Sequence, residues 1–145
     1  NPSLIGTWQT TDATYSFEKT EGKQYKLVIC SLPEKDTAMY VVSSGKIGTS
    51  WYLDSYPVVN SQEHHFLSMH LITKMTLSGD TLTLATLEAD WLSTMMAEKK
   101  RRVTHVQREN EIILTASTGE LQKFIASIGN NTDAFPDPDT LIRSR

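Results

Sequence analysis

The chain of 145 residues is 39% hydrophobic and 21% charged, a composition typical of one globular domain that buries a core without disulfides. Its formal net charge of -3 provides no overall positive field, which argues against nucleic acid or an anionic membrane surface as a partner. With Cys30 as the one cysteine, the sequence excludes an intrachain disulfide and a cysteine-based zinc site.

Short alternating segments joined by turn residues occupy the first half of the chain. One parity of each segment is mainly apolar, which predicts β-strands with a buried face. Turns rich in glycine, proline and charged residues separate these segments, for example at 21–23 and 33–36. Residues 43–45 are expected to form a further turn, between strands at 38–42 and 47–54.

The most regular pattern begins at residue 64 and continues to residue 85. Apolar residues of one parity mark its first half: Leu67, Met69, Leu71, Met75 and Leu77. The sequence Ser-Gly-Asp at 78–80 then supplies a turn, and Leu82 and Leu84 resume the alternation. We therefore expect a β-hairpin, with a glycine where the chain reverses.

Two later segments change to the helical period. The first covers about residues 88–100, with Trp91 in the middle of its apolar stripe. The second covers about residues 118–129, preceded by a capping box made by Ser117 and Glu120. Both helices are expected to pack against the sheet.

The end of the chain combines a last hairpin with a segment rich in proline. The hairpin is expected over residues 103–115, between the two helices. We expect one barrel-like domain over residues 1–130 and an irregular tail over residues 131–145. Phe135 and Leu141 are the residues expected to attach this tail to the body.

Consecutive strands with short connections favour a sheet that closes on itself, because closure removes exposed edges. The expected fold is mainly β. It is an antiparallel meander closed or strongly curved into a small barrel or half-barrel, with the two helices added.

Two sequence resemblances agree with this fold. Gly6-x-Trp8, near the start of a first strand and followed by a meander and a late helix, is similar to the opening of lipocalin and fatty-acid-binding-type barrels. The pieces YLD at 52–54, GDTLTLATLEADWL at 79–92 and LTASTGELQKF at 114–124 resemble small bacterial exported proteins or lipoproteins of uncharacterised function. The resemblances imply a small lipocalin-like barrel in the periplasm or cell envelope. Membrane contact is then expected only through a lipid anchor outside this chain.

Motifs for catalysis, cofactor binding and metal binding are not found in the sequence. There is no glycine-rich phosphate loop, nucleophile elbow or zinc-protease helix. On a regular strand His64 and His65 point to opposite faces, which does not suit binding of one metal ion. Cys30 shares its parity with Val28 and is expected to be a buried strand residue rather than a reactive thiol. We therefore expect a non-enzymatic protein without metal or cofactor.

The inner faces of the central strands predict the lining of a cavity for a small apolar ligand, because aromatic side chains and methionine suit such pockets. The candidate ligand-binding residues are Leu27, Ile29, Trp51, Leu53, Leu67, Met69 and Leu71. The alternative is a filled interior. The outer surface would then contact another protein of the cell envelope or of the secretion machinery, and no ligand would be bound.

The clearest charge feature is a basic run after the first helix. It consists of Lys99, Lys100, Arg101 and Arg102. Such a run can bind a phosphate or an acidic partner. The other interpretation is a solvated helix end, where the helix dipole favours positive charge.

Overall fold

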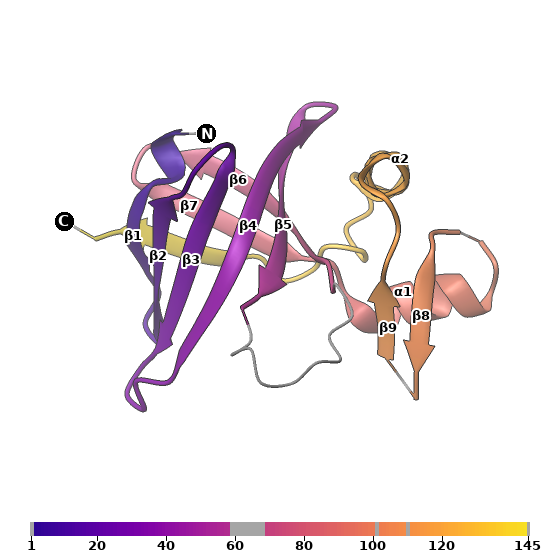
Figure 1. The fold of residues 1–145 in the computed structure, drawn as a ribbon, viewed down its shortest axis with the longest axis horizontal. Helices are drawn as coiled ribbons and strands as arrows, with labels where there is room; N and C mark the ends of the chain where they lie inside the picture. Colours follow the sequence, from indigo (N-terminus) through magenta and orange to yellow (C-terminus); the bar gives the residue numbers. More distant parts are fainter. Residues whose placement is uncertain (1, 59–68, 101, 110, 145) are drawn as a thin grey trace.

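Seven consecutive strands form an antiparallel meander, and an eighth strand from the end of the chain closes it into a barrel (Figure 1). The computed structural model describes residues 2–58, 69–100, 102–109 and 111–144. The barrel strands are β1 (Gly6–Gln9), β2 (Ala13–Lys19), β3 (Gln24–Ser31), β4 (Thr37–Ile47), β5 (Ser50–Pro57), β6 (Leu71–Ser78), β7 (Thr81–Thr86) and β10 (Asp139–Arg143). A short 3-10 helix, η1 (Pro2–Leu4), precedes β1.

The segment between β7 and β10 leaves the barrel and lies on one side of it (Figure 1). It contains α1 (Ala89–Ala97), β8 (His105–Arg108), β9 (Glu111–Leu114) and α2 (Thr118–Ile128), and β8 and β9 pair as a separate hairpin. Both ends of the described chain lie on the side of the barrel away from these helices (Figure 1).

The predicted fold class is confirmed. The protein is mainly β, with a closed eight-stranded antiparallel barrel and two helices, consistent with a small lipocalin-like barrel. The half-barrel alternative is excluded, because β10 pairs with both β1 and β7. The predicted central hairpin is β6–β7, and Gly79 in its turn has a φ of +58°, a conformation that glycine adopts without steric cost.

The prediction of an irregular tail over residues 131–145 is wrong for β10. This strand lies between β1 and β7, and its Leu141 pairs with Leu82. It was missed because it is short, follows two prolines and has a single large apolar residue facing the barrel interior. The attachment through Phe135 and Leu141 is confirmed, since both are buried. The barrel is therefore not complete within residues 1–130.

The turn expected at residues 43–45 is also wrong, because β4 runs through it without interruption. Ser43 pairs with Gln24 of β3 and with Asp54 of β5. Small polar residues do not force a turn where neighbouring strands satisfy their backbone groups. The chain reverses instead at Gly48, whose φ is +61°.

Two hydrophobic cores lie on opposite faces of one wall of the barrel, formed by β5, β6 and β7. The barrel core consists of Leu4, Trp8, Phe17, Tyr25, Leu27, Val42, Leu53, Met75, Leu82, Leu84 and Leu141. The helix core consists of Tyr52, Ile72, Ala85, Leu92, Val103, Leu114, Ala116, Leu121, Phe124, Ile125, Ile128, Ala134 and Phe135. Neighbouring residues such as Tyr52 and Leu53 thus face different cores, as the strand period requires.

The end of β10 is fixed to the start of the chain by Arg143. Its guanidinium carbon lies 4.0 Å from the ring centroid of Trp8, a cation–π geometry. Its two terminal nitrogens donate to the carbonyl oxygens of Ile5 at 2.9 Å and Ser3 at 2.5 Å. We call this set of contacts the Trp8–Arg143 clasp.

The clasp gives the Gly6-x-Trp8 motif a structural role. Gly6 has a φ of +129°, and a Cβ at this position would lie 2.8 Å from a guanidinium nitrogen of Arg143. A side chain at Gly6 would therefore be strained and would collide with the clasp. Trp8 is fully buried, and its Nε1 donates to the carbonyl oxygen of Leu4 at 2.9 Å, so its one polar atom is satisfied.

The first predicted helix is confirmed as α1, although it ends at Ala97 rather than near residue 100. Trp91 is only half-buried against the helix core, and Leu92 is the buried residue of this helix. The period alone therefore overstated the burial of Trp91.

The second helix begins as predicted, with Ser117 as its N-cap. Ser117 Oγ accepts from the backbone N–H of Glu120 at 3.4 Å. In a capping box the Glu120 carboxylate would accept from the backbone N–H of Ser117. Here it accepts instead from the backbone N–H of Thr104 at 2.7 Å and from the Thr104 hydroxyl. Glu120 thereby fixes α2 to the segment that leads into β8.

We expect Ser117→Ala to lower the free energy of unfolding by about 1 kcal/mol, because a helix N–H loses its side-chain acceptor. Urea denaturation followed by circular dichroism measures this change. Thr118→Ala, at the exposed first position of the same helix, is the control and is expected to change stability by less than about 0.5 kcal/mol. Equal effects of the two substitutions would contradict the capping role.

Candidate ligand-binding site

The barrel is filled in its middle and hollowed towards its two ends. Trp8, Phe17, Leu82 and Leu141 are each no more than 1% exposed and occupy the centre. One cavity lies where β5 ends and β6 begins, and another lies at the opposite end, where β5 begins and β6 ends. The first is lined by strand residues of the inward-facing parity, and the second combines three such residues, Trp51, Met75 and Leu77, with turn and η1 residues.

The first cavity, which we call the tyrosine cavity, has a volume of about 190 Å³. Its lining residues come from seven strands and are Tyr15, Leu27, Ile29, Tyr40, Leu53, Ser55, Leu71, Thr73, Leu84, Thr86 and Asp139. Leu27, Leu53 and Leu84 also belong to the barrel core and form an apolar floor. The cavity thus combines an apolar base with hydroxyl groups and one carboxylate.

The carboxylate of Asp139 acts electrostatically on the phenol of Tyr15. Burial raises the pKa of Tyr15, and the charges of Asp139 and Tyr40 raise it further. A raised pKa keeps the phenol protonated well into the alkaline range, so that it remains a hydrogen-bond donor. Asp139 lies beside the cavity because it shares the inward parity of Leu141 and pairs with Leu84 of the floor.

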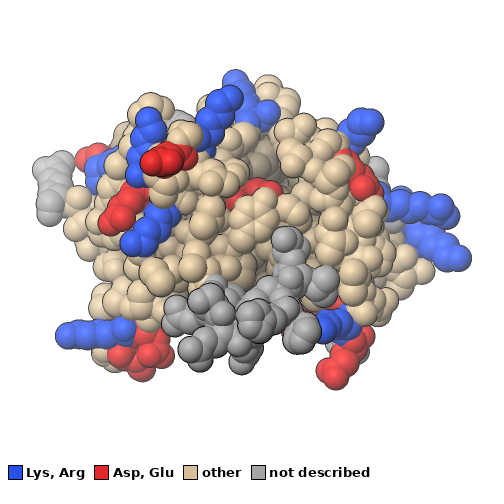
Figure 2. Space-filling view, in the orientation of Figure 1, with Lys and Arg blue, Asp and Glu red and all other residues tan. Residues whose placement is uncertain are grey.

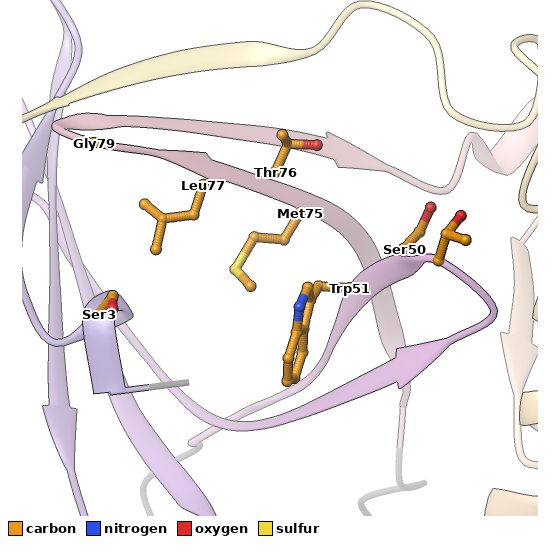
Figure 3. A pocket seen from close by; sticks show the side chains of 8 residues that line it. Ser3, Ser50, Trp51, Met75, Thr76, Leu77 and Gly79 are labelled. Atoms are coloured by element: carbon orange, nitrogen blue, oxygen red, sulfur yellow. The ribbon is translucent and has the colours of Figure 1, made fainter.

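The second cavity, which we call the end pocket, has a volume of about 470 Å³ and lies between η1 and the strands β5 and β6 (Figure 3). The side chains of Trp51, Met75 and Leu77 extend from the two strands towards the space in front of η1, which carries Ser3 (Figure 3). Ser50 and Thr49 add polar groups to the lining.

The structure brings four of the seven predicted ligand-binding residues together. Leu27, Ile29, Leu53 and Leu71 line the tyrosine cavity. Trp51 instead lines the end pocket. The other two are Met69, which is half-buried two residues before β6, and Leu67, which lies outside the described residues.

Sequence reasoning missed the polar part of the tyrosine cavity. Thr73 lies between Leu71 and Met75 on the inward parity, so the alternation already placed it inside the barrel. The same alternation also places Tyr15 inside the barrel. Asp139 could not be placed in this way, because the strand that carries it was not predicted.

The predicted basic run is not part of α1, which ends two residues before Lys99. Lys99, Lys100 and Arg102 are exposed, and Arg101 lies outside the described residues. Lys100 pairs with Glu98 at 2.6 Å. On the face drawn in Figure 2, basic and acidic side chains lie intermixed and mostly near the periphery.

A cluster of polar side chains lies on the outer face of the barrel, where β5 ends. His70 Nδ1 lies 2.9 Å from each carboxylate oxygen of Asp54, and Tyr56 donates its hydroxyl to the same carboxylate at 3.4 Å. The rings of Tyr56 and His70 are 5.1 Å apart. Burial and the charge of Asp54 raise the pKa of Tyr56. The cluster joins β5 to the residue before β6, which makes it a structural tie.

Cys30 is half-buried rather than buried, on the outer face of β3. The prediction of a buried strand cysteine is therefore wrong, because the helices that cover part of the outer wall do not reach β3 (Figure 1). His64 and His65 lie outside the described residues.

No group of three histidine, cysteine or acidic side chains is arranged to bind a metal ion in the described part of the chain. No described helix has the length and hydropathy needed to cross a bilayer. No family model, curated protein or solved structure matches this chain.

Proposed function

We propose that the protein is a non-enzymatic binding protein that holds a small apolar ligand in the tyrosine cavity. The observation that carries this proposal is an interior cavity of about 190 Å³ with an apolar floor. An apolar cavity of about 150 Å³ is large enough to bind benzene. The tyrosine cavity therefore suits one aromatic ring or a chain of about six carbons.

Long-chain ligands do not fit this geometry. A fatty acid that ran along the barrel axis would have to displace Trp8, Phe17 and Leu82, which fill the centre. Burial of six methylene groups at about 0.8 kcal/mol each gives about 5 kcal/mol. We therefore expect a dissociation constant of about 0.2 mM for a six-carbon chain.

We expect 1-hexanol to bind saturably and to shift the methyl resonances of Leu27, Ile29 and Leu53 in an NMR titration. Ile29→Trp is expected to abolish binding, because the larger ring occupies the cavity. Val28→Trp is the matched control, since Val28 is the next residue of the same strand and faces outwards. Thermal unfolding confirms that both variants are folded.

Two results would overturn the proposal. One is the absence of any saturable shift in the folded parent protein. The other is binding by Ile29→Trp with unchanged affinity, which would place the ligand elsewhere, for instance in the end pocket. The first result would favour the alternative of an interaction module that contacts an envelope protein through its outer surface.

The proposed location is the periplasm or cell envelope. It is supported by the resemblance of residues 52–54, 79–92 and 114–124 to bacterial exported proteins. Immunodetection in periplasmic, membrane and cytoplasmic fractions of the source cell tests it. Exclusive recovery from the cytoplasm would contradict it.

A further inference from the structure

From the rim of the tyrosine cavity we infer that the ligand carries a positively charged amine at one end of its apolar body. This inference rests on the proposed function and specifies the chemical class of the ligand. It follows from the charge, the aromatic rings and the free bonding capacity at the rim.

The charge of the lining favours a cation. Among the described residues that line the cavity, Asp139 is the acidic one, and none is a lysine or an arginine. A carboxylate at the rim attracts a cation and repels the carboxylate or phosphate of an anionic ligand. An apolar ligand with an anionic group is therefore disfavoured.

Among the described residues, the Asp139 carboxylate has unused capacity to accept hydrogen bonds. Within the part of the chain that the structure describes, its carboxylate makes no hydrogen bond and no ion pair. Asp139 is exposed, so a ligand at the rim can reach it from the mouth of the cavity. An ammonium group has three donors that match the oxygens of a carboxylate.

Two tyrosines lie beside this carboxylate. Tyr15 and Tyr40 lie on inward-facing positions of β2 and β4 and line the same cavity. Asp139 and Tyr40 both act on the Tyr15 phenol, so the three side chains are neighbours. Tyrosine rings attract ammonium groups through their faces. The rim thus offers a carboxylate and two rings to one cation.

The floor fixes where the rest of the ligand lies. Asp139 pairs with Leu84 across the β10–β7 ladder, and Leu84 belongs to the apolar floor. An amine at Asp139 therefore directs its chain towards Leu84 and Leu53. A primary amine with about six carbons fills this path.

Three probes of equal chain length test the inference on the 145-residue chain: hexylamine, 1-hexanol and hexanoate. They are titrated at pH 7 and followed by the same methyl resonances. We expect hexylamine to bind about tenfold more tightly than 1-hexanol, and hexanoate to bind more weakly than either. Asp139→Asn is expected to remove the advantage of hexylamine over 1-hexanol.

Asp137→Asn is the matched control. It removes the same charge two residues away, at an exposed position whose φ of 44° asparagine tolerates. Equal loss of hexylamine affinity in both variants would show a general charge effect and would overturn the role of Asp139. Equal binding of hexylamine and 1-hexanol to the parent protein would overturn the inference that the ligand carries an amine, while the proposed function would stand. Failure of all three probes would overturn both proposals.

Discussion

A chain that ends at Pro138 is expected to lose the cooperative unfolding transition of the 145-residue chain. The truncation removes β10, which pairs with β1 and β7 and contributes the fully buried Leu141. Loss of a buried leucine side chain alone costs about 2–5 kcal/mol. Loss of the strand also leaves two sheet edges unpaired and removes the Trp8–Arg143 clasp. The total is comparable with the whole stability of a typical domain, about 5–15 kcal/mol.

Thermal unfolding followed by circular dichroism measures the effect of the truncation. A chain that ends at Ser144, which keeps all of β10, is the control and is expected to unfold like the parent. A cooperative transition within a few degrees of the parent for the chain that ends at Pro138 would mean that the barrel does not need β10.

Trp8→Ala is expected to lower the free energy of unfolding by about 3–5 kcal/mol. The substitution leaves a large cavity in the centre of the barrel and removes the ring on which Arg143 stacks. Urea denaturation measures the loss. Trp91→Ala is the matched control. Because Trp91 is half-buried, this substitution is expected to lower the free energy of unfolding by about 1–2 kcal/mol. A larger loss from Trp91→Ala would show that the helix core, rather than the barrel core, dominates stability.

The local parts of this fold could be predicted from the sequence. The alternation around Gly79 indicated β6 and β7, and the same parity placed Leu53 and Leu71 inside the barrel. Ser117 indicated the start of α2. These features depend on residues close together in the chain, where strand and helix periods are directly visible.

The parts that depend on distant partners could not be predicted in this way. β10 has one fully buried residue, Leu141, and is a strand because β1 and β7 lie on both sides of it. Asp139 was therefore missed as a lining residue. The burial of Trp91 was overestimated for a related reason, because its exposure depends on which elements cover α1 and not on its helical period.

The clasp also has a consequence for the order of folding during synthesis. Arg143 bonds to Ile5, 138 residues earlier in the chain, so the chain as far as Arg143 must leave the ribosome before β1 and β10 can meet. Contacts of such long sequence separation form slowly. Until then the edges of β1 and β7 are available for pairing with other chains. The nascent barrel is thus expected to depend on a chaperone, or on rapid synthesis of β10.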